Sequence, residues 1–248
     1  MILFPNRPIF YNSILLEVKG DIMLVIPNPG TIIRQRGKAM KHDIPRVSQY
    51  NETSCASANY TMVANALGFP LGLHDVLEIT HGTLGQPQFW NWCLEQRIRI
   101  RCFSKNDYNA WANGGSPEWA RKTARWVVKF FSKRTNDKFR DSTIKFRSIL
   151  KNPNFKFQNT APDFDMIKSL FKDGYAVELM CDGWLIYGEK PQAQSLHRIF
   201  VTDITGDALY FHDPSSDGVA NFKTSRLNVN LALSVDGSEL VGYKRMLL

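Results

Sequence analysis

Cys55 stands where a cysteine can act as a nucleophile. It lies at the start of residues 54–67, a segment whose apolar spacing predicts a helix that Thr53 or Ser54 can cap. The backbone N–H groups of a first helical turn and the positive end of the helix dipole favour thiolate over thiol. A thiolate is the nucleophile that acyl transfer requires. Gln49 lies six residues before Cys55, and its amide can donate to an oxyanion beside the backbone N–H of Cys55.

His197 and Asp213 lie at the two ends of a predicted β-hairpin. The runs "RIFVTDI" and "ALYFHDP" flank the turn "TGD", so His197 opens the first strand and Asp213 ends the second. A carboxylate in that position can hold one imidazole nitrogen and orient the other toward a thiol. His212 alternates with Asp213 along the strand, and we expect it to face away. The order Gln, Cys, His, Asp therefore predicts acyl-transfer chemistry.

The elements around these residues form an α+β pattern. We expect an N-terminal hairpin with a turn at residues 19–21, and a helix that Asp163 or Asp165 caps and Gly174 ends. Residues 151–163 are typical of a loop. The other predicted helices are 73–82, 86–97, 116–133 and 142–151, and the other predicted strands are 98–103, 175–181, 219–227 and 240–248.

Two stretches of the chain resemble a known family. "QYNETSCASANYTMVANALGFP" is similar to a segment of the form Q-x5-C-G-x-A-x3-M-V, and "HRIFVTDITGDALYFHDPSSDG" to a strand of the form H-x3-V followed by DP after a short hairpin. Both segments are found in papain-like cysteine peptidases of the bacteriocin-processing kind, which cleave leader peptides after a double glycine. The resemblance covers about residues 43–80 and 163–225, and residue 56 is alanine where the family has glycine.

The resemblance implies a fold and four roles. The fold would be papain-like, with an N-terminal helical lobe whose nucleophile helix packs on a C-terminal antiparallel β-sheet. Cys55 would be the nucleophile, and His197 the general base and then the acid for the leaving group. Asp213 would orient His197, and Gln49 would line the oxyanion hole. No metal or organic cofactor is implied.

Charge and composition suggest how the chain is organised. The net charge of +8 is concentrated in residues 104–157, which hold 13 Lys and Arg against 4 Asp and Glu. We expect residues 1–42 to form a β-rich extension and 43–248 a peptidase domain with a basic helical insertion at about 104–160. The insertion either is a solvated surface or attracts an acidic partner, and we do not expect nucleic acid to be that partner.

The remaining motifs exclude several classes of protein. The cysteines Cys55, Cys93, Cys102 and Cys181 form no CxxC pair, so we expect no zinc site and free thiols in a cytoplasmic protein. No apolar run is long enough for a transmembrane helix, and the N-terminus is not typical of a signal peptide. We therefore expect no membrane partner, and we interpret the histidines other than His197 as structural or surface residues.

The sequence thus predicts a cysteine peptidase, a hydrolase that cleaves a peptide or amide bond in a peptide or protein substrate. Two alternatives stay open. The same triad can pass the acyl group to an amine as a transferase, or act as a deamidase. A catalytically inactive relative would instead be a binding module.

Overall fold

The computed structural model describes residues 14–18, 21–25, 42–50, 54–80, 86–106, 108, 144–191, 195–215 and 217–246. The chain divides into two compact units, Met1–Ala39 and Met40–Leu248. In the first unit, β1 (Ile14–Val18) and β2 (Asp21–Val25) pair as an antiparallel hairpin, which confirms the predicted N-terminal hairpin. The predicted helix at 116–133 lies outside the described residues.

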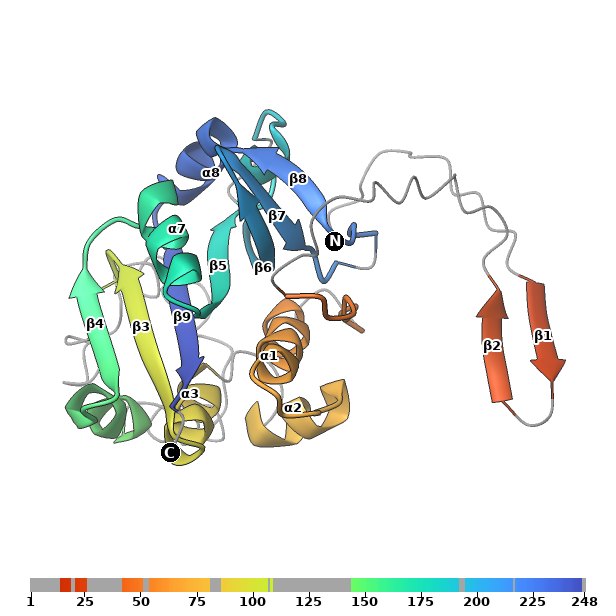
Figure 1. Cartoon of the computed structure of the whole chain (residues 1–248), viewed down its shortest axis with the longest axis horizontal. Coiled ribbons are helices and arrows are strands. Elements are labelled where there is room, and N and C mark those ends of the chain that lie inside the picture. Colours follow the sequence, from red (N-terminus) through yellow and green to blue (C-terminus); the bar gives the residue numbers. More distant parts are fainter. Residues whose placement is uncertain are drawn as a thin grey trace, which may run out of the picture. The chain divides into compact units, whose positions relative to one another are not determined.

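The second unit is built on a sheet of seven strands (Figure 1). Six of the seven strands follow one another by antiparallel pairing, and β4 pairs with β3 in parallel. In spatial order the strands are β4 (Phe155–Asn159), β3 (Ile98–Ser104), β9 (Glu239–Arg245), β5 (Ala176–Asp182), β6 (Leu196–Thr205), β7 (Ala208–His212) and β8 (Phe222–Ser225).

The sheet is therefore mixed: the predicted antiparallel pairing holds for six strands, and it does not hold for β4, which is parallel to β3. After β3 the chain passes through a helix at 144–151 and returns in the same direction as β4, which is the crossover that a parallel pair requires. The loop predicted at 151–163 contains β4. Phe146, Ile149 and Phe155 are buried, so this end of the expected insertion is part of the main domain.

Helices cover both faces of the sheet. Among the described residues the helices are α1 (Cys55–Ala66), α2 (Leu73–Thr80), α3 (Gln86–Glu95), 144–151, α7 (Phe164–Lys172) and α8 (Arg226–Leu233), with one 3-10 turn, η1 (Leu185–Tyr187). One apolar cluster, the α1-side core, holds residues of α1, α2, α3 and 144–151 against one face. The other cluster, the α7-side core, holds residues of α7 and α8 against the opposite face.

The capping signals explain which helices could be predicted. Asp163 caps α7 and its side chain accepts a hydrogen bond from the Met166 N–H, as expected, and Gly174 follows the helix with φ +84°. The helix α8 was not predicted, and the strand expected at 219–227 ends at Ser225. Ser225 caps α8 by accepting from the Asn228 N–H. None of the described helices is long and apolar enough to cross a membrane.

Candidate active site

The helix α1 begins at Cys55 and is buried on nearly all sides. Every residue from Ala56 to Ala64 is buried, so the helix runs through the interior rather than burying one face only. The Tyr60 ring stacks on Phe89 of α3 with 4.2 Å between centroids, a contact worth about 0.5–1.5 kcal/mol beyond the area it buries. This packing anchors the middle of α1 in the core.

The first turn of α1 presents a favourable end to an anion. No acidic side chain lies in this turn, and the Ser54 side chain does not cap it. The Ser54 hydroxyl instead accepts a hydrogen bond of 3.0 Å from the Tyr50 N–H, which folds the preceding loop onto the helix start. The first N–H groups of a helix have no acceptor within the helix. Cys55 is half-buried at this position, while Cys93, Cys102 and Cys181 are buried.

The β6–β7 hairpin brings His197 and Asp213 together. The Nε2 atom of His197 lies 2.7 Å from Oδ1 of Asp213. The strand register alone would not bring this about, because His212 pairs with Phe200 and the next pair would join Asp213 to Ile199. The chain instead leaves β7 after His212, and the turn at residues 213–215 carries the carboxylate back to the imidazole.

Two residues that the sequence did not single out complete the surroundings of Asp213. The Ser215 N–H and hydroxyl donate to Oδ1 at 2.7 and 2.5 Å, and the Tyr187 hydroxyl donates to Oδ2 at 2.5 Å. Burial would raise the pKa of Asp213, but the hydrogen bonds from His197, Ser215 and Tyr187 hold it well below its usual range. The side chain of Asp213 is therefore a carboxylate at every ordinary pH.

The signals for these two residues differ. An aspartate that accepts from the N–H two residues later is an Asx-turn, so "DPS" could have indicated Ser215. Tyr187 comes from η1, 26 residues before Asp213, and only the fold places it there.

The imidazole of His197 also contacts Cys55. Burial disfavours the imidazolium, but hydrogen bonds to Asp213 and Cys55 raise the pKa of His197 to about 10. Burial likewise disfavours the thiolate, but the hydrogen bond to His197 and the charges of His197 and Arg198 lower the pKa of Cys55. Since Nε2 faces Asp213, Nδ1 is the ring nitrogen left for the thiol. The two side chains are thus suited to exist as a thiolate and an imidazolium.

Gln49 lies beside the turn that carries Asp213. Its N–H donates to the Pro214 carbonyl at 2.7 Å, and Arg46 donates to the carbonyls of Asp213 and Ser215, each at 2.8 Å. The side-chain oxygen of Gln49 is buried with no hydrogen-bond partner among the described residues. The structure thus brings the Gln49 backbone to the site. The predicted role in an oxyanion hole stays a prediction.

His212 and His74 take no part in this candidate site. His212 faces away from Asp213 as predicted, because its Nε2 donates to the Ile44 carbonyl at 2.9 Å and its Nδ1 accepts from the Asn221 N–H. Burial lowers the pKa of His212. His74 lies on the surface beside Glu78, and His81 lies outside the described residues. Within the described ranges no group of three His, Cys, Asp or Glu could hold a metal ion.

The four predicted site residues therefore come from three separate parts of the second unit. The start of α1, the loop before it and the β6–β7 hairpin supply them. His197 contacts Asp213 and also lowers the pKa of Cys55, so it links the other two. No protein-family model matches the chain, and no curated protein matches it.

Proposed function

We propose that this protein is a papain-like cysteine hydrolase that cleaves a peptide or amide bond. One observation carries the proposal: His197 Nε2 lies 2.7 Å from Asp213 Oδ1, and interactions with both Asp213 and Cys55, at the start of α1, raise the pKa of the same imidazole. This is the order nucleophile, base and orienting carboxylate that acyl transfer uses. A buried helix with cysteine at its N-terminus, packed on a sheet that carries histidine and aspartate, supports a papain-like fold.

The proposed reaction has two steps. The Cys55 sulfur attacks the substrate carbonyl carbon, the C–N bond breaks, and the His197 proton passes to the leaving amine. Water then attacks the resulting thioester, gives a proton back to His197, and releases the acid product and the Cys55 thiolate. The Asp213 carboxylate keeps the imidazole oriented in both steps, and the N–H of Cys55 with the Gln49 amide would stabilise each oxyanion.

The first test is the alkylation rate of each cysteine with iodoacetamide between about pH 4 and 9, measured by mass spectrometry. Cys55 should react well below the ordinary thiol pKa of about 8.5. The buried Cys93, Cys102 and Cys181 are internal controls, because burial raises the pKa of each. In His197→Ala the rapid reaction at low pH should disappear.

Turnover is tested separately on a denatured protein substrate, by counting new N-termini. Cys55→Ala should remove all cleavage while the circular dichroism spectrum stays that of the wild type. Cleavage by this variant, or four cysteines that react slowly and alike, would overturn the proposal.

A further inference from the structure

A buried group of charged side chains lies next to the proposed nucleophile, and neither the resemblance nor the proposed reaction uses it. Arg198 on β6, Glu178 on β5 and Glu239 on β9 are 6%, 0% and 1% exposed. Three neighbouring strands thus each place one charged residue in the interior. Charged residues are almost never fully buried unless they are paired or have a function.

The strand register places all three on the sheet face that α1 covers. Met180 pairs with Arg198 on one side and with Glu239 on the other, and Glu178 lies two residues before Met180. Residues in such positions share one face. His197 pairs with Cys181, so it starts from the opposite face.

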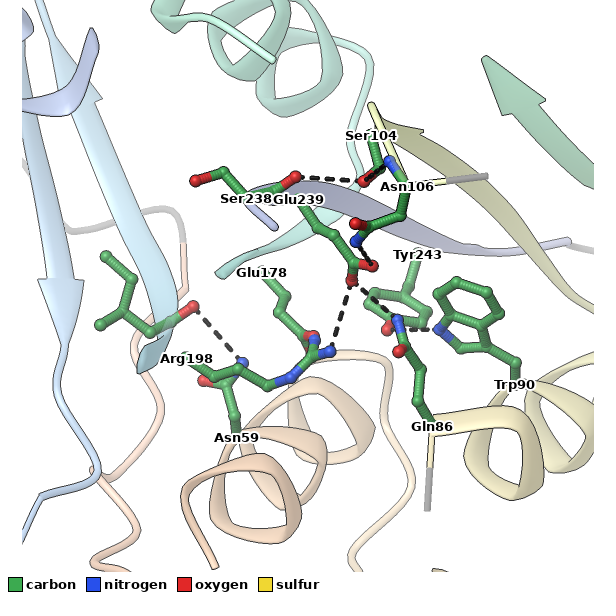
Figure 2. A network of polar contacts seen from close by, with 11 residues as sticks. Asn59, Gln86, Trp90, Ser104, Asn106, Glu178, Arg198, Ser238, Glu239 and Tyr243 are labelled. Atoms are coloured by element: carbon green, nitrogen blue, oxygen red, sulfur yellow. Dashed lines mark hydrogen bonds and ion pairs between the residues drawn. The ribbon is translucent and has the colours of Figure 1, made fainter. Parts of the chain in front are cut away.

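The contacts hold the guanidinium in one orientation (Figure 2). Arg198 donates through Nη1 to Glu178 Oε1, and through Nη2 to Glu239 Oε2 at 3.3 Å. Gln86 donates to Glu239 Oε2 at 2.8 Å, and Asn106 donates to Glu239 Oε1 at 3.3 Å. We call these five residues the Arg198 network.

The network meets α1 beside Cys55. Successive residues of β6 contact the first two turns of the helix. The interaction with His197 lowers the pKa of Cys55, the Arg198 guanidinium carbon lies 5.6 Å from the centre of the Tyr60 ring, and Asn59 donates to the Ile199 carbonyl at 3.4 Å. A fixed cation therefore lies along the same short stretch of helix as the thiol.

The composition of the network is not what stability alone would select. Two carboxylates share one guanidinium, and Glu178 Oε2 is buried with no hydrogen-bond partner among the residues that the structure describes. Replacing a buried ion pair by apolar side chains is often neutral or stabilising, so a buried ionic group is weak evidence of a stabilising role. A use for the positive charge itself accounts better for its presence.

We propose that Arg198 is a positioning residue for Cys55, whose buried guanidinium stabilises the negative sulfur while Glu178 and Glu239 hold it in place. This inference rests on the proposed function, because it concerns the same thiolate. The charge of Arg198 and its backbone N–H both lower the pKa of Cys55, after the larger effects of burial and of His197.

The other titratable groups around the network do not compete for this role. Burial raises the pKa of Cys93, Cys102, Tyr60 and Tyr243, so these groups stay neutral. Burial raises the pKa of Glu239 to about 7, so this carboxyl is mostly protonated in acid. Below neutral pH the guanidinium is then opposed mainly by Glu178.

The test is the pH profile of Cys55 alkylation in matched variants. Arg198→Met should raise the apparent thiol pKa, so that alkylation at about pH 5 falls roughly three- to tenfold, and Arg198→Lys should restore most of the rate. Arg226→Met is the control: it removes a guanidinium on α8 that pairs with Asp165 and Asp207 and lies outside the Arg198 network, so alkylation in acid should stay unchanged.

Arg198→Met leaves Glu178 buried without its cation and could fail to fold. The double variant Arg198→Met with Glu178→Gln removes both charges and should still show the slower alkylation, while Glu178→Gln alone should not. Wild-type rates in all folded Arg198 variants, or an equal loss in Arg226→Met, would overturn this inference. A wild type without rapid alkylation of Cys55 would instead overturn the proposed function.

Discussion

Two ionic groups lie side by side in this protein, at His197 and at Arg198, and they differ in charge balance, in hydrogen bonding and in exposure. Around His197, one carboxylate faces one imidazole, and both Asp213 oxygens accept hydrogen bonds. Around Arg198, two buried carboxylates share one cation, and one oxygen of Glu178 has no hydrogen-bond partner in the described part of the chain. The His197 side chain is 16% exposed, whereas that of Arg198 is 7% exposed.

The difference follows from the alternation of side chains along a strand. Consecutive residues of β6 point to opposite faces of the sheet, so Arg198 points into the α1-side core and the neighbouring His197 does not. His197 also lies near the start of β6, at the end of the sheet. A group at the edge with balanced charge can gain and lose a proton during a reaction. A buried guanidinium held between two carboxyl groups keeps its own charge at every ordinary pH, which suits a fixed support better than a proton carrier.

The largest effect is expected from a variant that displaces only the turn at residues 213–215, which carries Asp213. A Cβ atom at Gly218 would lie 2.6 Å from the Asp213 carbonyl oxygen and 2.9 Å from its Cγ. We expect Gly218→Ala to displace the carboxylate, to cost about 1–3 kcal/mol of unfolding free energy, and to slow Cys55 alkylation at about pH 5 roughly tenfold.

Gly206→Ala is the matched control for that variant. A Cβ atom at Gly206, in the turn of the same hairpin, would meet nothing within 4 Å, although its φ of +60° makes alanine strained. Gly206→Ala should lose about 1 kcal/mol of unfolding free energy and keep the wild-type alkylation rate. Equal alkylation rates in the two alanine variants would show that the turn does not position the site.

The Arg198 network should reveal itself in the pH dependence of stability. Folding raises the pKa of Glu239 from 4.5 to about 7, so the folded protein binds more protons than the unfolded chain in this interval. Stability due to Glu239 is therefore present below about pH 4.5 and is lost as the pH rises toward 7. In Glu239→Gln the difference in unfolding free energy between these pH values should shrink by roughly 1–3 kcal/mol.

Urea unfolding of wild type and variant at several pH values checks this prediction. His197 also has a raised pKa, but its contribution is complete below pH 6.5 and is lost only toward pH 10, so the two effects occupy different intervals. Parallel stability curves for wild type and Glu239→Gln between pH 4.5 and 7 would contradict the prediction.

The smallest expected effect concerns Tyr187. Tyr187→Phe removes the 2.5 Å hydrogen bond to Asp213 Oδ2 and keeps the ring packed against Phe211 and Phe222. We expect a loss of about 0.5–1.5 kcal/mol of unfolding free energy and a two- to fourfold slower alkylation, roughly. Tyr210→Phe on β7 is the control. If Tyr187→Phe does not slow alkylation, Tyr187 contributes to packing only.

Local signals explain the parts of the fold that were predicted correctly. The β6–β7 hairpin follows from alternating apolar residues around a turn, and α7 from an aspartate cap and a terminal glycine. The strand β4 was missed because it is only five residues long, and its parallel partner lies some 55 residues earlier in the chain. A pairing across that distance leaves no local pattern.

By itself, the sequence determined that a cysteine begins a helix and that a histidine and an aspartate sit at the ends of one hairpin. Both are statements about neighbours along the chain, which capping and strand alternation control. Only the tertiary structure decided that Tyr187 and Ser215 hold the aspartate, and that Arg198, Glu178 and Glu239 meet beneath α1. These residues meet because the order of β9, β5 and β6 in the sheet sets their distances, and packing over the whole core sets that order.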